Sequence, residues 1–200
     1  MRKDYLNHYY LDDQKQLLNR KEISFRFLNV DYYFETADNV FSKDHVDMGT
    51  HLLIETALDS GIKAPVLDYG CGYGAVGIVL SKNNYASIGL DVVDRALQLA
   101  NLNAEKNKVD FKAYKVDDLN EYRESFKTIL LNPPIRAGKE VIYQMFAHAA
   151  MMLQNDGVLY VVMRKQHGAN SAVQHLKTLF KSVDIIKKHK GFYIIKNIVD

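Results

Sequence analysis

The feature that most constrains the fold is a glycine-rich turn between two apolar segments. Val66-Leu67-Asp68-Tyr69 has the composition of a short buried strand, and the stretch DYGCGYGAVG that begins at Asp68 leads into an apolar helical segment at 75–84. Glycines at this density let the backbone turn sharply and let another group lie directly against it. The order strand, glycine turn, helix predicts the first strand–helix unit of an α/β sheet.

The chain after Gly49 repeats this alternation. Helices are predicted at 50–61, 75–84, 94–107, 139–157 and 171–182, with Asp94 as the N-cap of the third and Gly157 closing the fourth. Strands are predicted at 66–69, 86–93, 109–116, 126–132 and 158–164, and two more lie within 183–196 around a Lys-Gly turn. The pattern predicts a doubly wound, Rossmann-like, mostly parallel sheet of seven strands, ending in an antiparallel hairpin.

The N-terminal part has a different character. Residues 1–20 are polar and expected to be irregular or helical, whereas EISFRFLNVDYYFET is rich in aromatic and β-branched residues with a break at Asn-Val-Asp. This favours two short antiparallel strands. We therefore expect a small β appendage at 1–48 and one α/β domain at 49–200.

Composition excludes several classes of protein. The single cysteine, Cys71, excludes an internal disulfide and a cysteine zinc cage, and the seven histidines have no metal-ligand spacing, so no metal is expected. No apolar run reaches the roughly 20 residues of a membrane span, and the first residues lack a signal-peptide pattern, so the chain is expected to be cytoplasmic. From Arg164 onward eight residues are basic and two acidic, which suits an anionic partner such as RNA or, equally, a solvated surface.

The glycine turn fits two kinds of cofactor. Gly72, Gly74 and Gly77 satisfy G-x-G-x-x-G, and Asp91 lies 19 residues after Gly72, where an acidic residue grips ribose hydroxyls, so a dinucleotide is a candidate. Asp68 argues against it, because a carboxylate there repels a pyrophosphate. S-adenosylmethionine instead carries a positively charged ammonium and sulfonium centre, and a carboxylate at Asp68 attracts these charges. Asp68 as a simple cap of the following turn is the structural alternative.

Asn132-Pro133-Pro134 follows the predicted strand 126–132, at the edge where parallel sheets bind ligands. The Asn132 side-chain oxygen and the Pro133 carbonyl can accept hydrogen bonds from the two N–H groups of an exocyclic amine. These hydrogen bonds free the lone pair of the nitrogen for attack on a methyl group. Two prolines make the segment rigid, so these acceptors need no reorganisation during the reaction. A strand-terminating turn is the alternative interpretation.

Taken together, DYGCGYGAVG, GLDVV, VDDL and NPPIRAGKEV resemble the class I methyltransferases with the small methyltransferase domain, in the RsmC-type branch that methylates guanine N2 of small-subunit ribosomal RNA. FSKDHVDMGTHLL resembles the segment that packs over the site in that branch. The resemblance implies that Asn132, Pro133, Pro134 and Ile135 hold the target amine. Arg136 and Lys139 can then steer RNA phosphates at the rim of the site, with exposed charges on a helix N-terminal turn as the alternative. The resemblance also implies cofactor contacts from Asp68, Gly70, Gly72, Gly74, Asp91 and Asp118, where the residues alone leave Asp117 and Asp118 open.

The resulting hypothesis is an S-adenosylmethionine-dependent methyltransferase for guanine N2 in ribosomal RNA or the small ribosomal subunit. Ile135 replaces the aromatic residue that many N-methyltransferases carry after Asn-Pro-Pro, which weakens adenine N6 and protein glutamine as targets and leaves the stacking partner of the base open. A non-catalytic RNA-binding module and a dehydrogenase are further alternatives. The modified nucleotide, the assembly state of the RNA and the oligomeric state are not determined by the sequence.

Overall fold

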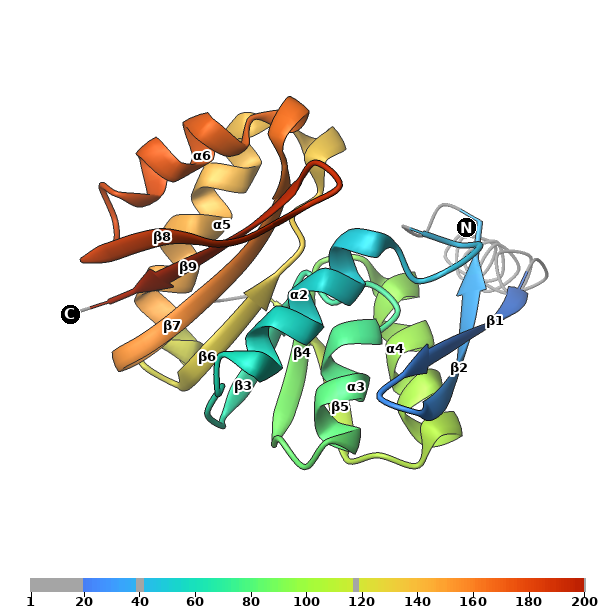
Figure 1. Ribbon diagram of the computed structural model, residues 1–200. Coiled ribbons are helices and arrows are strands. Elements are labelled where there is room, and N and C mark those ends of the chain that lie inside the picture. Colours follow the sequence, from blue (N-terminus) through green and yellow to red (C-terminus); the bar gives the residue numbers. More distant parts are fainter. Residues whose placement is uncertain (1–19, 39–41, 117–118, 200) are drawn as a thin grey trace, which may run out of the picture.

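The computed structural model describes residues 20–38, 42–116 and 119–199 of the 200-residue chain. Its centre is a seven-stranded sheet in the order β5-β4-β3-β6-β7-β9-β8 (Figure 1). All neighbouring strands are parallel except β9, which runs antiparallel to both β7 and β8. The strands are β3 Val66–Tyr69, β4 Ser87–Asp91, β5 Phe111–Lys115, β6 Phe126–Leu131, β7 Leu153–Arg164, β8 Ser182–His189 and β9 Phe192–Ile198. The predicted fold class is therefore confirmed.

Helices cover both faces of this sheet and divide the interior into two hydrophobic cores (Figure 1). One core lies under α2 (Met48–Asp59), α3 (Ala75–Lys82) and α4 (Asp94–Asn107). The other lies under α5 (Lys139–Met152) and α6 (Ala169–Leu176). Burying both faces explains why the central strands are almost continuously apolar. Among the described residues, no helix is both long and apolar enough to cross a membrane.

The N-terminal hairpin packs onto the first of these cores. Strands β1 (Arg20–Phe27) and β2 (Val30–Ala37) pair antiparallel across a turn in which Leu28 and Asn29 have positive φ. Their inward residues Phe25, Tyr32 and Phe34 belong to the same cluster as α2, α3 and α4. The expected β appendage is thus present and shares its hydrophobic core with the α/β domain. Residues 1–19, for which an irregular or helical structure was expected, lie outside the described residues.

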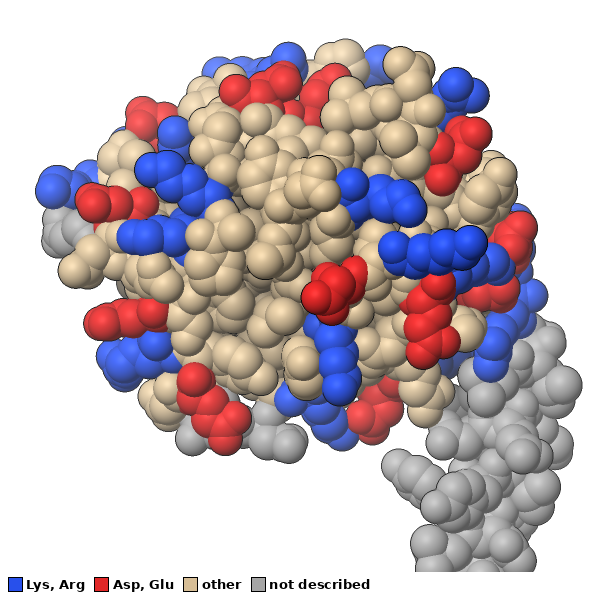
Figure 2. Space-filling view, turned by 90° about the horizontal axis from the view of Figure 1, so that it is seen from below, with Lys and Arg blue, Asp and Glu red and all other residues tan. Residues whose placement is uncertain are grey.

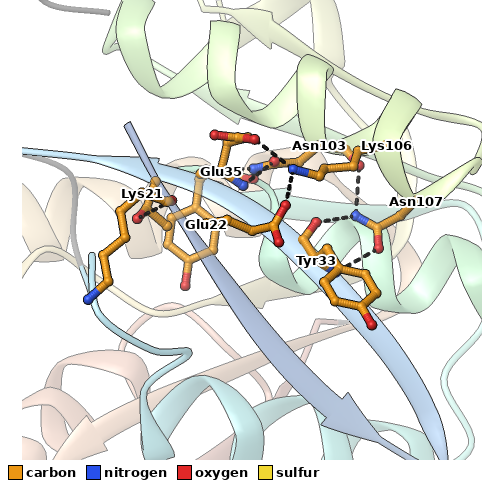
Figure 3. Close-up of polar contacts among 9 residues, drawn as sticks. Lys21, Glu22, Tyr33, Glu35, Asn103, Lys106 and Asn107 are labelled. Carbon is orange, nitrogen blue, oxygen red and sulfur yellow. Dashed lines mark hydrogen bonds and ion pairs between the residues drawn. The ribbon is translucent and has the colours of Figure 1, made fainter. Parts of the chain in front are cut away.

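Helix α4 holds the hairpin through side chains that pair with strand backbone (Figure 3). The Asn103 carboxamide accepts from the Glu35 N–H at 2.6 Å and donates to the Glu35 carbonyl at 3.0 Å. One turn later, Asn107 makes the same pair of bonds with Tyr33, at 3.1 and 2.8 Å. Lys106, between them in sequence, forms ion pairs with Glu22 and Glu35. The two carboxamides therefore act as a neighbouring strand for β2 and satisfy backbone groups at its edge.

Three predicted details differ from the structure. Helix α6 ends at Leu176, whereas this helix was predicted to continue to residue 182, which begins β8. Helix α5 ends at Met152, and residues 153–157, predicted to be helical, begin strand β7. The backbone N–H groups of Glu124 and Ser125 donate to the carbonyls of Met151 and Met152, which ties this end of α5 to the start of β6. Asp156 has positive φ and stands where the β6–β7 register shifts, so the polar Asn-Asp-Gly stretch forms a bulge within the strand. The predicted N-cap Asp94 is the first helical residue of α4, and the cap position is Val93.

Candidate active site

Asp68, the glycine loop, Asp91 and Asn132 lie at the carboxyl ends of three neighbouring strands. Tyr69 at the end of β3 is level with Leu90 of β4 on one side and with Leu131 of β6 on the other. Asp91 and Asn132 each follow one residue later and therefore flank the start of the glycine loop. Parallel α/β sheets bind ligands at this edge.

The glycine loop has the backbone shape that only glycine adopts easily. Gly70, Gly72 and Gly74 have φ of 69°, 55° and 87°, in the left-handed region. A Cβ placed on Gly72 would meet no atom within 4 Å, so the space in front of this residue is open. The loop thus offers bare backbone to a ligand at the N-terminus of α3.

Gly77, the last glycine of the pattern, serves helix packing instead. A Cβ at this position would lie 2.0 Å from Cε2 of Phe111, so the ring of β5 fills the space that a side chain would need. Close contact of α3 with the sheet is therefore the reason for this glycine.

Asp68 is a buried carboxylate behind the loop. Its Oδ2 accepts the Gly77 N–H in the first turn of α3 at 2.9 Å, so the capping role considered from the sequence is present. Burial raises the pKa of Asp68 to about 7, the Gly77 hydrogen bond opposes this rise, and the charge of Asp91 adds to it. A carboxylate that water does not solvate is stabilised by a cationic ligand group.

Asp91 joins the glycine loop to the turn after β4. Its Oδ2 accepts the Gly72 N–H and its Oδ1 accepts the Val93 N–H, both at 2.9 Å. A carboxylate offers about four acceptor positions, so both oxygens can still accept from hydroxyl groups. Val92 and Val93 beside it are 73% and 50% exposed, which leaves apolar surface next to an acceptor group. The pair suits a nucleoside, with ribose on the carboxylate and a base on the valines.

Asn132 is held by the segment that precedes α2. Its Nδ2 donates to Thr50 Oγ1 at 2.9 Å and to Asp47 Oδ2 at 3.3 Å. Asn132 is half-buried and Pro133 is buried, whereas Pro134 and Ile135 are exposed. After them the backbone forms a 3₁₀ turn at Ile135–Ala137 and enters α5 at Lys139. The Asn132 carboxamide is therefore fixed by two side chains at the N-terminus of α2.

The predicted basic residues Arg136 and Lys139 lie on the exposed rim that follows the prolines. Lys139 Nζ sits 5.1 Å from the ring centre of Tyr143. Asp118, the predicted adenine contact, and its alternative Asp117 lie outside the described residues. Within the described ranges, no three His, Cys, Asp or Glu side chains gather as a metal site requires.

A basic hollow of about 400 Å³ opens beyond the end of β7. Because β7 is the direct neighbour of β6, the hollow lies at the same edge of the sheet as Asn132. The Arg164 guanidinium stacks over Phe192 at 4.3 Å from the ring centre, which holds it in place. The residues lining the hollow are Arg164, Lys165, Gln166, Asn170, Lys190 and Gly191.

Three polar residues of this region were not identified as functional candidates from the sequence. Asp47 and Thr50 contact Asn132, and Asn103 donates to the Tyr73 carbonyl in the glycine loop at 2.9 Å while binding Glu35 of the hairpin. The sequence signal for Asp47 and Thr50 was their place in FSKDHVDMGTHLL, the segment expected to pack over the site, and Asp47 also had the signal of an N-cap ahead of a helix. Asn103 carried only a weak signal, an amide in the middle of an amphipathic helix.

This sheet, with its antiparallel last strand, glycine loop and acidic residue after β4, defines the class I S-adenosylmethionine-dependent methyltransferase fold. Residues 31–196 match the methyltransferase small domain family, and the chain belongs to that family. It is similar to the uncharacterized protein YbxB of Bacillus subtilis, with 39% identity over 94% of this chain and 96% of that protein.

Two further similarities concern named enzymes. The ribosomal RNA small subunit methyltransferase C of Haemophilus influenzae is 33% identical over 62% of this chain. The structure of the T. thermophilus 16S rRNA N2 G1207 methyltransferase (RsmC), in complex with AdoMet and guanosine, superimposes on 91% of this chain with a TM-score of 0.82 and 23% identity. The chain spans 39% of the first enzyme and 51% of the second.

Proposed function

We propose that this protein transfers a methyl group to the exocyclic N2 amine of a guanine in small-subunit ribosomal RNA. The observation that carries the proposal is the Asn132-Pro133 pair at the end of β6, beside the open glycine loop. The proposal also divides the chain into the appendage at 1–48 and the catalytic domain at 49–200.

The cofactor residues present fit S-adenosylmethionine, which when bound supplies an electrophilic methyl group on a sulfonium sulfur. Asp68 would face the ammonium of its methionine part. The positive-φ glycines Gly70, Gly72 and Gly74 would let it lie against the backbone. Asp91 would accept the ribose hydroxyls, and Asp118 would contact the adenine.

The clamp residues act on the target amine. Asn132 Oδ1 and the Pro133 carbonyl oxygen would accept hydrogen bonds from the two N–H groups of this amine. These bonds would favour a pyramidal nitrogen, whose lone pair is no longer delocalised into the base. The nitrogen would gain the methyl group as the carbon–sulfur bond of the sulfonium breaks and its electron pair returns to sulfur, and it would release one proton to solvent. Because proline fixes φ and restricts the residue before it, Pro133 and Pro134 keep both acceptors in place throughout.

Cofactor affinity is expected to depend on pH through Asp68. Without cofactor the pKa of Asp68 is about 7, and a neighbouring ammonium favours the charged form, so binding below this pH must release a proton. We expect affinity to fall about five- to tenfold from pH 7.5 to pH 6. Calorimetric titration in buffers of different ionisation enthalpy measures both the affinity and the released proton. An equal pH dependence in Asp68→Asn would contradict this assignment.

The same pKa has a consequence for the stability of the cofactor-free protein. The pKa is raised on folding, so protonated Asp68 stabilises the fold fully below its ordinary value of 3.8. This contribution is lost as pH rises through about 7. Bound cofactor should offset this loss of stability, because its ammonium would stabilise the charged form of Asp68.

The basic hollow supports RNA as the substrate. Arg164, Lys165 and Lys190 bring three positive charges together at the same edge of the sheet as the clamp, and the lining contains no acidic residue. The face at the bottom of Figure 1, seen in Figure 2, carries Lys, Arg, Asp and Glu side chains interspersed. Phosphates flanking the target nucleotide would lie in the hollow, and Arg136 and Lys139 would face further phosphates.

Removing two of these charges is expected to weaken RNA binding without affecting the cofactor. In Lys165→Gln/Lys190→Gln we expect KM for RNA to rise about tenfold and the slope of log KM against log salt to fall by about 1.5, because fewer counterions are released. Lys63→Gln/Lys112→Gln makes the same change in net charge outside the hollow and serves as the control. Equal salt slopes in the two double variants would exclude the hollow as the phosphate site.

The function is tested with tritiated S-adenosylmethionine and four substrates: small ribosomal subunits, their deproteinised RNA, large-subunit RNA and a release factor. Nucleoside analysis is expected to find the label in N2-methylguanosine from a small-subunit substrate. Label in large-subunit RNA would show that large-subunit RNA is the substrate. Label in a glutamine or in adenine N6 would show that the target amine is not guanine N2. Cofactor binding with no transfer to any of the four would favour a non-catalytic module.

A further inference from the structure

The Asn132 carboxamide can face its substrate in only one of two orientations. The two ends of an asparagine side chain have nearly the same shape, but the oxygen accepts hydrogen bonds and the nitrogen donates them. An amine clamp requires the oxygen to point at the target. The groups that face Asn132 from α2 therefore decide whether the clamp functions.

These groups form a chain of hydrogen bonds with a fixed direction. Thr50 Oγ1 donates to Asp47 Oδ2 at 2.5 Å, so the Thr50 oxygen presents its lone pairs to Asn132. The Asp47 carboxylate is itself only an acceptor. Both groups that Asn132 Nδ2 contacts therefore require a donor, and the NH₂ end must point toward α2. The Asn132 Oδ1 is thereby directed away from α2.

We propose that Asp47 and Thr50 are positioning residues that set the acceptor end of Asn132 toward the target amine. The proposal rests on the function proposed above and deepens it. In the chain from Asn132 through Thr50 to Asp47, each donor is polarised by the next acceptor, and the series ends on a carboxylate. This polarisation also places more negative charge on Asn132 Oδ1, which strengthens it as an acceptor.

The chain is anchored in a rigid part of the fold. Asp47 is the N-cap of α2, and its Oδ1 accepts from the Gly49 N–H at 2.8 Å and from the Thr50 N–H at 3.4 Å. Thr50 is 6% exposed. A Cβ on Gly49 would lie 2.9 Å from both Asp47 Oδ1 and Phe192 Cε1, so β9 packs directly behind the cap. One carboxylate thus caps the helix and orients the clamp, and the orientation is preorganised.

Two Thr→Val substitutions on the same helix separate orientation from packing. Thr50→Val keeps the volume but removes the nearer of the two acceptors of Asn132 Nδ2. Thr56→Val changes a buried threonine whose Oγ1 has no hydrogen-bond partner among the described residues. For Thr50→Val we expect kcat to fall about 10- to 100-fold with the KM for RNA and the cofactor Kd unchanged, as for other hydrogen bonds that support a reacting group. Thr56→Val should retain wild-type kcat, and Thr50→Ser should restore most of the activity.

Asp47→Asn tests the direction of the chain without removing the cap, because asparagine is as good an N-cap as aspartate. If the new amide donates to Thr50, the threonine hydroxyl turns toward residue 132 and the Asn132 carboxamide reverses. We expect a loss of kcat at least as large as in Thr50→Val, with a melting temperature close to that of the wild type. Asp94→Asn, at the start of α4, is the matched control.

A measurement without turnover keeps this inference separate from the proposed function. In ¹⁵N-asparagine-labelled protein, the Asn132 side-chain amide protons should exchange slowly in the wild type and in Thr56→Val. They should exchange faster in Thr50→Val and Asp47→Asn. Fast exchange in the wild type, wild-type kcat in Thr50→Val, or equal losses in Thr50→Ser and Thr50→Val would each overturn the proposal. Slow exchange in a protein that methylates none of the tested substrates would uphold the orientation and refute only the function.

Discussion

Replacing Asn132 by alanine is expected to lower kcat at least a hundredfold while cofactor affinity stays within about twofold of the wild type. The substitution removes one of the two preorganised acceptors of the amine. Loss of one such group in a dry, rigid site typically costs 10²- to 10³-fold in kcat. Asn132 has no bond to the glycine loop or to Asp91, because its side-chain contacts are to Thr50 and Asp47. Binding of S-adenosylmethionine should therefore be nearly independent of it.

The measurement is single-turnover methyl transfer alongside calorimetric cofactor binding. Asn155→Ala, an exposed asparagine in the early part of β7, is the control for a general effect of losing a carboxamide. Asn132→Asp adds a second test. It keeps the shape and an acceptor, but it sets a carboxylate against Asp47 and removes the donor to Thr50. Rapid turnover in both Asn132 variants would refute the clamp, and a matching loss of cofactor affinity would assign Asn132 to the cofactor site instead.

Asn103→Ala is expected to destabilise the protein by about 3 to 5 kcal/mol and to weaken cofactor binding. Asn103 is fully buried and pairs with three backbone groups, the N–H and C=O of Glu35 and the C=O of Tyr73. Each buried group left without a partner costs about 1 to 3 kcal/mol. In a chain of this size the loss corresponds to a fall of roughly 10 °C in melting temperature. Tyr73 lies in the glycine loop, so the loop should lose part of its preorganisation.

Asn101→Ala is the matched control on the same helix. Its carboxamide also bridges backbone, at Ala113 N and O, but it is half-buried and contacts β5 instead of the loop. We expect a loss of about 1 to 2 kcal/mol and unchanged cofactor affinity. Thermal unfolding of both variants measures the loss of stability, and calorimetric titration measures their cofactor affinity. Equal losses in stability, or tight cofactor binding by Asn103→Ala, would show that Asn103 does not couple the hairpin to the loop.

The sequence predicted the arrangement of the sheet because its signals are local and periodic. Short apolar runs bounded by glycines and polar turns appear at β3, β4, β6 and β7, and a strand–helix alternation has few topologies open to it. The C-terminal hairpin was predicted from the Lys190-Gly191 turn, where both residues have positive φ. The predicted helix that begins at Lys139 is present, but its predicted end at Gly157 was wrong, because the polar stretch before this glycine forms a bulge in β7.

The residue types of the candidate site were also visible in the sequence, but their relations were not. That Asp91 and Asn132 flank the glycine loop follows from strand order, which the alternation predicts. That Asp68 reaches the N–H of Gly77 depends on how closely α3 approaches the sheet, and this is set by Phe111. No spacing along the chain encodes such a distance.

The sequence by itself determined the fold class, the glycine loop and the Asn-Pro-Pro segment, because backbone propensity and periodic burial act over neighbouring residues. Only the tertiary structure decided which end of Asn132 faces the substrate. Asp47 and Thr50 precede Asn132 by 85 and 82 positions and meet it only once α2 has packed across the sheet. The orientation of a side chain follows from the donors and acceptors around it, and in a folded protein these belong to segments that are distant in the sequence.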